Sequence, residues 1–451
     1  MKIYHLSNSF IIIETQNAKI CCDPWVGRAN YGGWHSFPEF EKNYLINFLK
    51  DVDIIYISHL HDDHLDTEFL KESGLNKKKF LIKNFTFKTL LNRLKSIGVN
   101  EIFELEPYEI FSYADAKMSI LPQMSTNSSE LDEDVEYDID TSVIISSEKE
   151  VFFNQVDNPY STKDYITLAN WIKIHYGEIT IAALMAGAAS EYPHTFLNIN
   201  RKEEKEKIVQ NVLRKLIEKL DILKPLYYFP AGGTYFIPGK FYRLNPLIAQ
   251  PTINQIEETL SKSNNNVKFL HLEGGKSVFF DMNSNNHVIV EDSFRTISCD
   301  IEKSILSHKE DLYDYEFVED NITFTLLNEI FNFAKLNWEE VLIAKNIKIE
   351  QDIEFIIYSS LNLTEDNSKI NEQPIGILEL KSNLTECKGL LKIHMDLRSM
   401  YLCLIRKKVW NGTIGALCLF ERIPNVFYPS VTFSLNYLII NNFQKETLNL
   451  N

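Results

Sequence analysis

The sequence predicts an α/β fold, in which short buried strands alternate with amphipathic helices. Three runs rich in β-branched or aromatic residues, KIYHL, SFIIIE and AKICCD, follow one another within the first 23 residues and are predicted strands. Between Lys205 and Leu223 the apolar residues recur at a spacing typical of a helix with one buried face. A further strand, Leu226–Phe229, follows that helix. This alternation is typical of a layered α/β domain.

The elements between these two regions are predicted from the same kinds of pattern. Phe40–Leu49 has its apolar residues at helical spacing, and the largely apolar run Val52–Ser58 is a predicted buried strand. Two strands, Thr141–Ile145 and Val151–Val156, flank a polar turn. We therefore expect a hairpin that ends at Asp157.

After about residue 290 the pattern changes, which predicts a second domain. Helical spacing covers Ile322–Leu336, and the apolar segment Tyr428–Ile440 is expected to pack against the first domain or against a second copy in a homodimer. Further strands are predicted around Ile353, Ile375, Leu390 and Leu402, although Leu397–Val409 also has the pattern of a helix. The predicted division is a first domain over residues 1–298 and a smaller α/β domain over residues 299–451.

The composition argues against several classes of protein. The 451 residues carry 46 basic and 62 acidic side chains, a formal net charge of −16, whereas nucleic-acid binding needs a surplus of cations or a basic face. No apolar run approaches the roughly 20 residues of a membrane span, and the N-terminus lacks the pattern of a signal peptide. The six cysteines form no CxxC pair, which indicates a reducing compartment. We expect a cytoplasmic protein without nucleic-acid or membrane partners.

The motif that carries chemistry is ISHLHDDHLD, at the end of the predicted strand Val52–Ser58. It places three imidazoles and two carboxylates within six residues, and such groups need partners when they are buried. Because alternate side chains of a turn point to a common side, His59 and His61 can bind one divalent metal while Asp63 and His64 face a second. Imidazole and carboxylate ligands suit zinc or iron. The alternative is a polar loop with surface histidines.

This HxHxDH pattern resembles the metal-binding motif of the metallo-β-lactamase superfamily, which implies a four-layer αββα sandwich for the first domain. Within that superfamily, the chain is similar to the metallo-β-lactamase-like portion of the cytidine-monophosphate N-acetylneuraminic acid hydroxylases. The segments that carry this similarity are CDPWVG, ISHLHDDHLD, DTSVII with VDN, LMAGAAS with EYPHTF, LKPLYYFPAGGTYF and IHMDLRSMYLCLIRKKVWNG. The resemblance implies a metalloenzyme with one or two divalent ions, iron or zinc.

The resemblance also implies roles for individual residues. Asp23 resembles the buried aspartate that braces the metal-binding turn, and Asp157 resembles the carboxylate that bridges two metals. Each of them could instead be an ordinary turn residue. Asp63 is the predicted catalytic residue, because it would orient a metal-bound water. The predicted metal ligands are His59, His61, Asp63, His64 and Asp157.

The chain departs from the family where a further metal-binding histidine is usual. No histidine lies between Asp66 and Asp157, and this stretch contains an acidic run instead. A carboxylate of the run, or Gln123, could replace the imidazole; a solvated acidic loop is the alternative. The run consists of Glu130, Asp132, Glu133, Asp134, Glu136, Asp138 and Asp140. A non-catalytic relative with a degenerate site is therefore a further hypothesis.

Several other residues are candidates for a substrate pocket. The segment PAGGTYFIPG contains Tyr235 but no histidine, which leaves His194 and His271 as distant candidates for the usual last imidazole. Lys240 and Arg243 could attract an anionic substrate to this acidic protein. Alternatively, Lys240 and Arg243 are solvated cations on the protein surface.

The cysteines do not have the spacing to histidine that an iron–sulfur electron-transfer centre needs. A Rieske iron–sulfur cluster needs CxH and CxxH pairs, and none of the six cysteines is followed by histidine at either spacing. We expect no Rieske cluster in this chain, so a hydroxylase would need a separate electron donor. The predicted function is an iron-dependent oxygenase or hydroxylase that acts on a polar small molecule or nucleotide-sugar, with a zinc-dependent hydrolase as the alternative.

Overall fold

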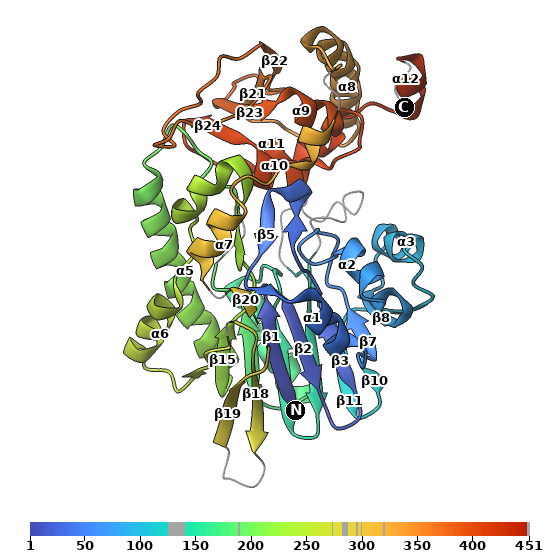
Figure 1. Ribbon diagram of the computed structural model, residues 1–451, viewed down its shortest axis with the longest axis vertical. Helices are drawn as coiled ribbons and strands as arrows, with labels where there is room; N and C mark the ends of the chain where they lie inside the picture. The colour runs from blue at the N-terminus through green and yellow to red at the C-terminus, as the bar shows by residue number, and fades with distance from the viewer. Residues whose placement is uncertain are drawn as a thin grey trace.

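The computed structural model describes residues 1–124, 140–187, 190–272, 274–281, 287–294, 296–298, 300–318 and 321–448. Two large sheets lie in the lower part of Figure 1, and a smaller sheet formed by C-terminal residues lies above them. The predicted α/β class is confirmed. None of the helices in the described ranges combines the length and the apolar character that crossing a membrane requires.

The first large sheet has eight strands in the order β19-β18-β1-β2-β3-β7-β8-β9. The three predicted N-terminal strands form an antiparallel meander at its centre, and β7, β8 and β9 continue it in parallel. The strands are β1 Lys2–Ser7, β2 Phe10–Glu14, β3 Lys19–Cys22, β7 Ile54–Tyr56, β8 Lys79–Lys83, β9 Glu101–Leu105, β18 Lys276–Asp281 and β19 His287–Asp292.

The second large sheet has seven strands in the order β10-β11-β12-β13-β14-β15-β17. The predicted hairpin is the antiparallel pair β12 and β13, and β14 and β15 run parallel to β13. The carboxyl ends of β13, β14 and β15 therefore meet at one edge. The strands are β10 Phe111–Tyr113, β11 Ala116–Pro122, β12 Thr141–Ser147, β13 Glu150–Asn154, β14 Ile181–Leu184, β15 Tyr227–Pro230 and β17 Lys268–Phe269.

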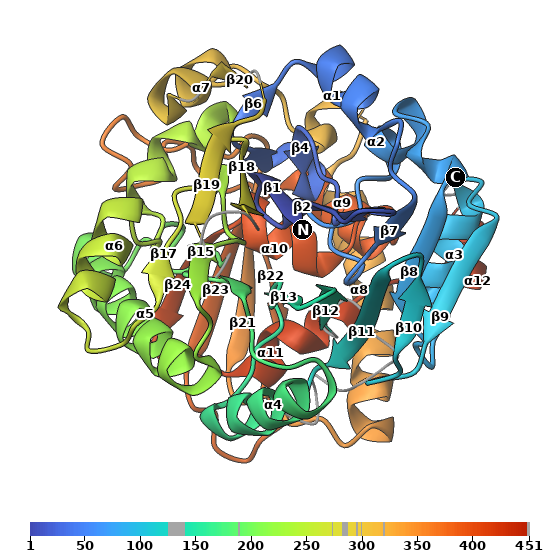
Figure 2. The same cartoon turned by 90° about the horizontal axis from the view of Figure 1, so that it is seen from below.

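Helices cover the outer face of each sheet, which produces the four αββα layers that the resemblance implies. Helices α1, α2 and α3 share one buried cluster with the first sheet, and α4, α5 and α6 share another with the second. A third cluster, which includes Ile13, Tyr56 and Met118, fills the space between the sheets. Figure 2 shows the two sets of helices on opposite flanks of the strands. The helices are α1 Lys42–Leu49, α2 Thr67–Glu72, α3 Thr89–Ser96, α4 Thr162–His175, α5 Arg201–Leu223 and α6 Ile253–Lys262.

Helix α5 begins four residues before its predicted start. Asn200 caps it, because its side chain accepts a hydrogen bond from the N–H of Glu203. At the other end Lys224 adopts a left-handed conformation with φ 49°, directly before Pro225. The helix thus ends where the sequence predicts.

The C-terminal sheet has the strand order β22-β21-β23-β24. The predicted strand around Leu402 is wrong, because Leu402 lies in helix α9, which begins at Leu397 as the alternative helix does and ends at Leu404. Asp396 caps this helix by accepting a hydrogen bond from the N–H of Arg398. The elements of this part are α8 Phe324–Ala344, β21 Asp352–Tyr358, β22 Gly376–Leu380, β23 Leu390–Asp396, α9 Leu397–Leu404, α10 Trp410–Leu417, β24 Leu419–Ile423, α11 Pro429–Ser434 and α12 Asn442–Thr447.

Short elements complete the described chain. They include one three-stranded sheet, β16-β5-β4, and one two-stranded sheet, β20-β6. Their bounds are β4 Arg28–Ala29, η1 Asn30–Gly32, β5 Trp34–Ser36, β6 Glu39–Phe40, η2 Leu75–Lys77, β16 Tyr235–Phe236, η4 Gly239–Leu247, β20 Thr296–Ser298, α7 Ile301–Ser307, η5 Asp314–Phe317 and η6 Leu435–Tyr437.

An arm formed by residues 28–36 joins the sandwich to the C-terminal part, and its strand β5 points toward α10 in Figure 1. Trp34 stacks on Tyr235 with ring centroids 4.3 Å apart. Gly33 lies so close to Ala416 that a Cβ on the glycine would be 2.4 Å from the Cβ of that alanine. The arm is therefore packed against residues from the far end of the chain.

One hydrophobic cluster contains both the arm and the C-terminal sheet, with Trp34 and Phe355 among its members. It also includes Val431 and Leu435, so the apolar segment Tyr428–Ile440 packs within its own chain. A homodimer contact stays a prediction. The domain boundary between residues 298 and 299 also stays a prediction, since this cluster extends across it.

Candidate metal centre

The predicted metal-binding turn lies between β7 and α2. His59 and His64 are fully buried, and the N–H of His64 donates to the carbonyl of His61 at 3.0 Å. Asp66 ends the turn and caps α2 by accepting a hydrogen bond from the N–H of Phe69 at 2.9 Å. Strand β7 thus ends before the motif and helix α2 begins after it, and the three histidines lie on the turn between them.

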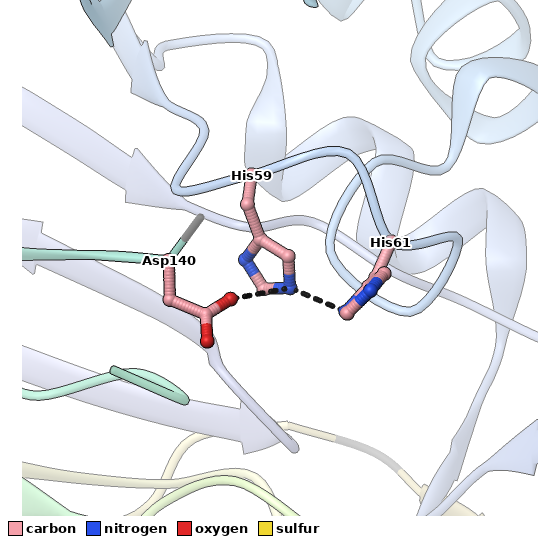
Figure 3. Close-up of side chains that lie close together, drawn as sticks. All are labelled: His59, His61 and Asp140. Carbon is pink, nitrogen blue, oxygen red and sulfur yellow. Dashed lines mark hydrogen bonds and ion pairs between the residues drawn. The ribbon is translucent and has the colours of Figure 1, made fainter. Parts of the chain in front are cut away.

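His59, His61 and Asp140 converge on one point (Figure 3). Nε2 of His59 lies 2.8 Å from Nδ1 of His61 and 3.4 Å from Oδ1 of Asp140. The three ligand atoms lie within 4.8 Å of one another, a separation that allows them to bind one ion. Burial, reinforced by the charge of His64, lowers the pKa of His59 well below its ordinary value. The ring is therefore neutral, which is the form that binds a metal.

A second group consists of His59, His64 and Asp157. Nε2 of His64 lies 3.2 Å from Oδ2 of Asp157 and 3.5 Å from Oδ2 of Asp63. The other carboxylate oxygen of Asp157 is buried and has no hydrogen-bond partner among the described residues. Such an oxygen is costly to bury unless a cation binds it. The second group therefore also fits a metal ion.

The charges of this second group depend on one another. Burial opposes a charge on His64, but the carboxylates of Asp63 and Asp157 outweigh burial and raise the pKa of His64 well above its ordinary value. Burial by itself would raise the pKa of Asp157, but His64 outweighs it and holds that pKa below the ordinary value. The carboxylates thus require positive charge at this place, and a divalent cation can supply it.

Asp23 braces the turn from the side away from Asp157. Its buried carboxylate accepts hydrogen bonds from the N–H of Ser58 at 2.8 Å and from the hydroxyl of Ser58 at 2.7 Å, and it lies 3.0 Å from Nδ1 of His64. When Nδ1 of His64 donates to Asp23 and the ring is neutral, the lone pair of Nε2 is available to a metal ion beside Asp157. Asp23 itself has φ 42°, a left-handed conformation that aspartate tolerates better than most residues.

Asp140 is absent from the predicted ligand set, although the acidic run that it ends was a candidate replacement for the missing imidazole. Its N–H donates to Oε1 of Gln123 at 3.1 Å, so Gln123 supports its backbone. The next residue, Thr141, donates its hydroxyl to the carbonyl of Ser58 at 2.8 Å, which ties the start of β12 to the metal-binding turn. The other acidic residues of the run, Glu130–Asp138, lie outside the described residues.

Two amides hold the turn from outside the motif. The side-chain N–H of Asn8 donates to the carbonyl and to Oδ2 of Asp63, both at 3.3 Å. Nδ2 of Asn411, in α10, lies 2.8 Å from Nε2 of His61. The C-terminal part of the chain thus contacts the candidate centre directly, which no sequence pattern indicates.

The predicted pocket residues lie in different surroundings. Tyr235 is buried, and burial, reinforced by the charges of Asp63 and Glu191, raises its pKa. His194 is buried, and desolvation lowers its pKa to about 3. His271 is exposed and lies 3.2 Å from a carboxylate oxygen of Glu257. Of these three residues, Tyr235 is the one whose pKa is raised by the charge of Asp63.

The structure separates the two predicted pocket cations from the histidine cluster. Lys240 forms an ion pair with Glu316 at 3.1 Å and lies over the ring of Tyr315. Arg243 is exposed in η4. Neither cation lines the two clefts that open beside His61. Their predicted role in substrate binding stays untested.

Comparison with known proteins agrees with this architecture. Residues 2–140 match the family described as beta-lactamase superfamily domain. The chain is 25% identical over 274 residues to the cytidine monophosphate-N-acetylneuraminic acid hydroxylase of Mus musculus, which covers 59% of this chain and 43% of that protein. It is 33% identical over 104 residues to a Mycobacterium tuberculosis protein named for a Rieske 2Fe-2S centre, covering 23% of this chain and 20% of that protein.

Among solved structures, CmlA, a diiron beta-hydroxylase from Streptomyces venezuelae, is similar at a TM-score of 0.40 and 15% identity, covering 60% of this chain and 53% of that chain. This chain spans less than half the length of the two curated relatives above. The resemblance stated from the motifs is nevertheless confirmed: residues 2–140 match the beta-lactamase superfamily domain, and more than half of the chain is similar to the cytidine monophosphate-N-acetylneuraminic acid hydroxylases.

Proposed function

We propose that this chain is a metal-dependent hydroxylase with the metallo-β-lactamase fold, which acts on a polar small molecule or a nucleotide-sugar. The observation that carries the proposal is the pair of ligand groups that share His59. Together with Asp63 they offer three imidazoles and three carboxylates. The similarity to proteins named as hydroxylases over 57% and 59% of the chain supports the same reaction class.

The donor set supports iron as the metal. His59, His61 and His64 supply nitrogen, and Asp63, Asp140 and Asp157 supply oxygen, in a cluster without a thiolate. Nitrogen and oxygen donors of this kind bind Fe(II) and zinc alike. A carboxylate in place of an imidazole, however, adds a negative charge to the set. This charge favours the trivalent ion that iron forms and zinc does not.

Each residue around the metal has a task that the contacts support. Asp23 holds a proton on Nδ1 of His64, which keeps Nε2 available as a ligand. Asn8 fixes the carboxylate of Asp63, and Asn411 fixes the ring of His61. Bound iron would supply the activation of O2, with one oxygen atom inserted into a C–H bond and the other released as water. A separate donor would provide the two electrons and two protons that this balance requires.

A zinc-dependent hydrolase is the second candidate, and the position of Asp63 favours it. Its carboxylate lies between His64 and the side chain of Asn8, at 3.5 Å and 3.3 Å. If zinc were held here, it would supply an activated water, and Asp63 would be placed to accept a proton from this water and to orient it toward an ester or amide. Histidine and aspartate are ordinary zinc ligands.

Metal analysis of the protein purified without chelators tests the proposal. We expect one or two iron ions per chain and consumption of O2 by the reduced protein. Both should be lost in His61→Ala and in Asp140→Ala and retained in His271→Ala, which removes an exposed histidine outside the cluster. Bound zinc without O2 consumption would instead support the hydrolase. The absence of stoichiometric metal, with unchanged stability of His61→Ala, would contradict both and support a non-catalytic relative.

A further inference from the structure

A cleft of about 470 Å³ opens beside His61, between the sandwich and the C-terminal part. Tyr31 and the metal-binding turn contribute to one wall, and residues 406–409, which connect α9 to α10, contribute to the other together with the start of α10. The volume lies within the range of small-molecule sites in proteins. This cleft therefore has the size and the position of a substrate site.

The lining of the cleft is cationic, although the protein as a whole is acidic. It includes four cations, Arg93, Arg406, Lys407 and Lys408, and one carboxylate, Asp62. The formal sum is 4 − 1 = +3, against −16 for the chain. Cations gathered in a concave site concentrate a positive potential there. This potential attracts anions to a place next to the candidate metal centre.

Lys408 is the lining cation with the greatest need of an anionic partner. Its side chain is 5% exposed, and Nζ is buried without a hydrogen-bond partner among the described residues. The ammonium lies 4.4 Å from the ring centre of Tyr31 and 5.3 Å from that of Tyr315. The two nearby carboxylates, Asp314 and Asp396, are paired with Arg28 at 2.8 Å and with Arg398 at 3.0 Å. Burial lowers the pKa of Lys408 to about 8, so it is mostly charged at neutral pH. A buried charge without an acceptor is costly, and a bound anion would relieve this cost.

Helix α10 adds backbone donors on the same side. Its N-cap residue Val409 makes no side-chain cap, and the first hydrogen bond of the helix runs from the N–H of Thr413 to the carbonyl of Val409. The positive end of the helix dipole therefore lies at residues 410–412. Asn411 and Gly412 line the cleft. A helix N-terminus of this kind favours a bound anion.

We infer that the cleft binds the phosphate group of the substrate, held by Lys408 and Arg406. A phosphate monoester is a dianion with three free oxygens, so it matches several converging cations better than a carboxylate does. The cleft is larger than one phosphate, which leaves room for the rest of the molecule. The inference deepens the proposed function, on which it rests, by narrowing the polar small molecule to a phosphate monoester and disfavouring a nucleotide-sugar, whose phosphate is esterified on both sides.

The position of Asn411 connects the phosphate site to the reaction. His61 and Asn411 line this cleft and also a second one of about 310 Å³, which Asp140 lines as well. A substrate anchored by its phosphate in the first cleft can therefore extend past Asn411 toward His61 and Asp140. The C-terminal part then selects the substrate, and the sandwich holds the metal.

Equilibrium dialysis of chelator-treated protein with inorganic phosphate, at constant ionic strength, tests the inference. We expect saturable binding of one phosphate per chain at millimolar concentrations or below, and displacement by a sugar phosphate. Arg406→Gln and Lys408→Gln should each weaken binding about tenfold, which corresponds to about 1.4 kcal/mol. Arg214→Gln is the matched control, because it removes an exposed arginine of α5 that does not line the cleft.

The possible results separate this inference from the proposed function. Arg406 is exposed, so its variant reports on binding even if Lys408→Gln fails to fold. Absence of saturable binding, unchanged binding by Arg406→Gln, or failure of the sugar phosphate to compete would overturn the inference. Phosphate binding that requires the metal and disappears in His59→Ala would indicate that phosphate binds to the metal. That result would overturn the inference about the cleft but would not contradict the proposed metal centre. Phosphate binding by metal-free protein supports the cleft whatever the outcome with iron and O2.

Discussion

Replacement of Asp23 tests whether the buried carboxylate braces the metal-binding turn. Asp23→Ala removes the common acceptor of the N–H and hydroxyl of Ser58 and the partner of Nδ1 of His64. All of these groups are buried, so water cannot replace the lost acceptor without rearrangement of the turn. Asp23→Asn keeps the size and one carbonyl oxygen but removes the charge.

The expected loss follows from the contacts. A hydrogen bond to a charged group contributes about 1.5–3 kcal/mol, but the bonds share one acceptor and do not add. Removal of one partner from a buried charged pair costs about 3–5 kcal/mol, which is the loss of unfolding free energy expected for Asp23→Ala. The left-handed φ of 42° disfavours alanine further, by about 1 kcal/mol. Asp23→Asn should lose about 1–2 kcal/mol.

Urea unfolding of the metal-free proteins, followed by tryptophan fluorescence, measures these losses without a contribution from metal affinity. Asp53→Ala is the control, since Asp53 is partly exposed and accepts one hydrogen bond, from the N–H of Lys19 at 2.8 Å. It should lose about 1 kcal/mol. Equal losses for Asp23→Ala and Asp53→Ala would refute the bracing role.

Three further predictions concern the candidate site and its surroundings. Asp140→Asn keeps the size but removes the charge that lies 3.4 Å from Nε2 of His59, so competition with a chromophoric chelator should show metal affinity reduced about tenfold or more; unchanged affinity would contradict its role as a ligand. His194 has a folded-state pKa of about 3, below its ordinary value of 6.5, so the unfolded chain takes up the proton first as the pH falls and stability is lost below pH 6.5. Urea unfolding of the wild type should therefore lose about 2 kcal/mol more than that of His194→Gln between pH 6.5 and 5, and equal losses would show that the imidazole is not buried in its neutral form. Tyr235→Phe removes a buried hydroxyl that has no hydrogen-bond partner among the described residues, so the unfolding free energy should stay within about 1 kcal/mol of the wild type; a larger loss would show that the hydroxyl has a partner.

Local patterns predict much of the fold because most of the signals are short-range. The runs at β1, β2 and β3, the turn at HxHxDH and the hairpin that ends at Asp157 each depend on residues close in the sequence. The cluster around His59 then follows from the sheets, which bring the end of β7 and the end of β13 to the same edge.

The contributions of Asp140 and Asn411 depend on long-range packing and could not be predicted in the same way. Asp140 reaches His59 because of how β12 aligns with the turn after β7, and Asn411 meets His61 across 350 residues of sequence. The surroundings of the lysines could not be predicted from local patterns either. The sequence contains Lys240 and Lys408 alike, but only the tertiary structure pairs Lys240 with Glu316 and buries Lys408 beside Tyr31.

The arm of residues 28–36 has a consequence for synthesis of the protein. Trp34 and Tyr235 stack early in the chain order, but Gly415, which lies against Trp34, is translated roughly 180 residues after Tyr235. At 5–20 residues per second this interval lasts about 10–35 s. During it, the side of Trp34 that faces α10 in the folded protein stays uncovered by that helix. A product that stops at residue 298 would lack this cover permanently.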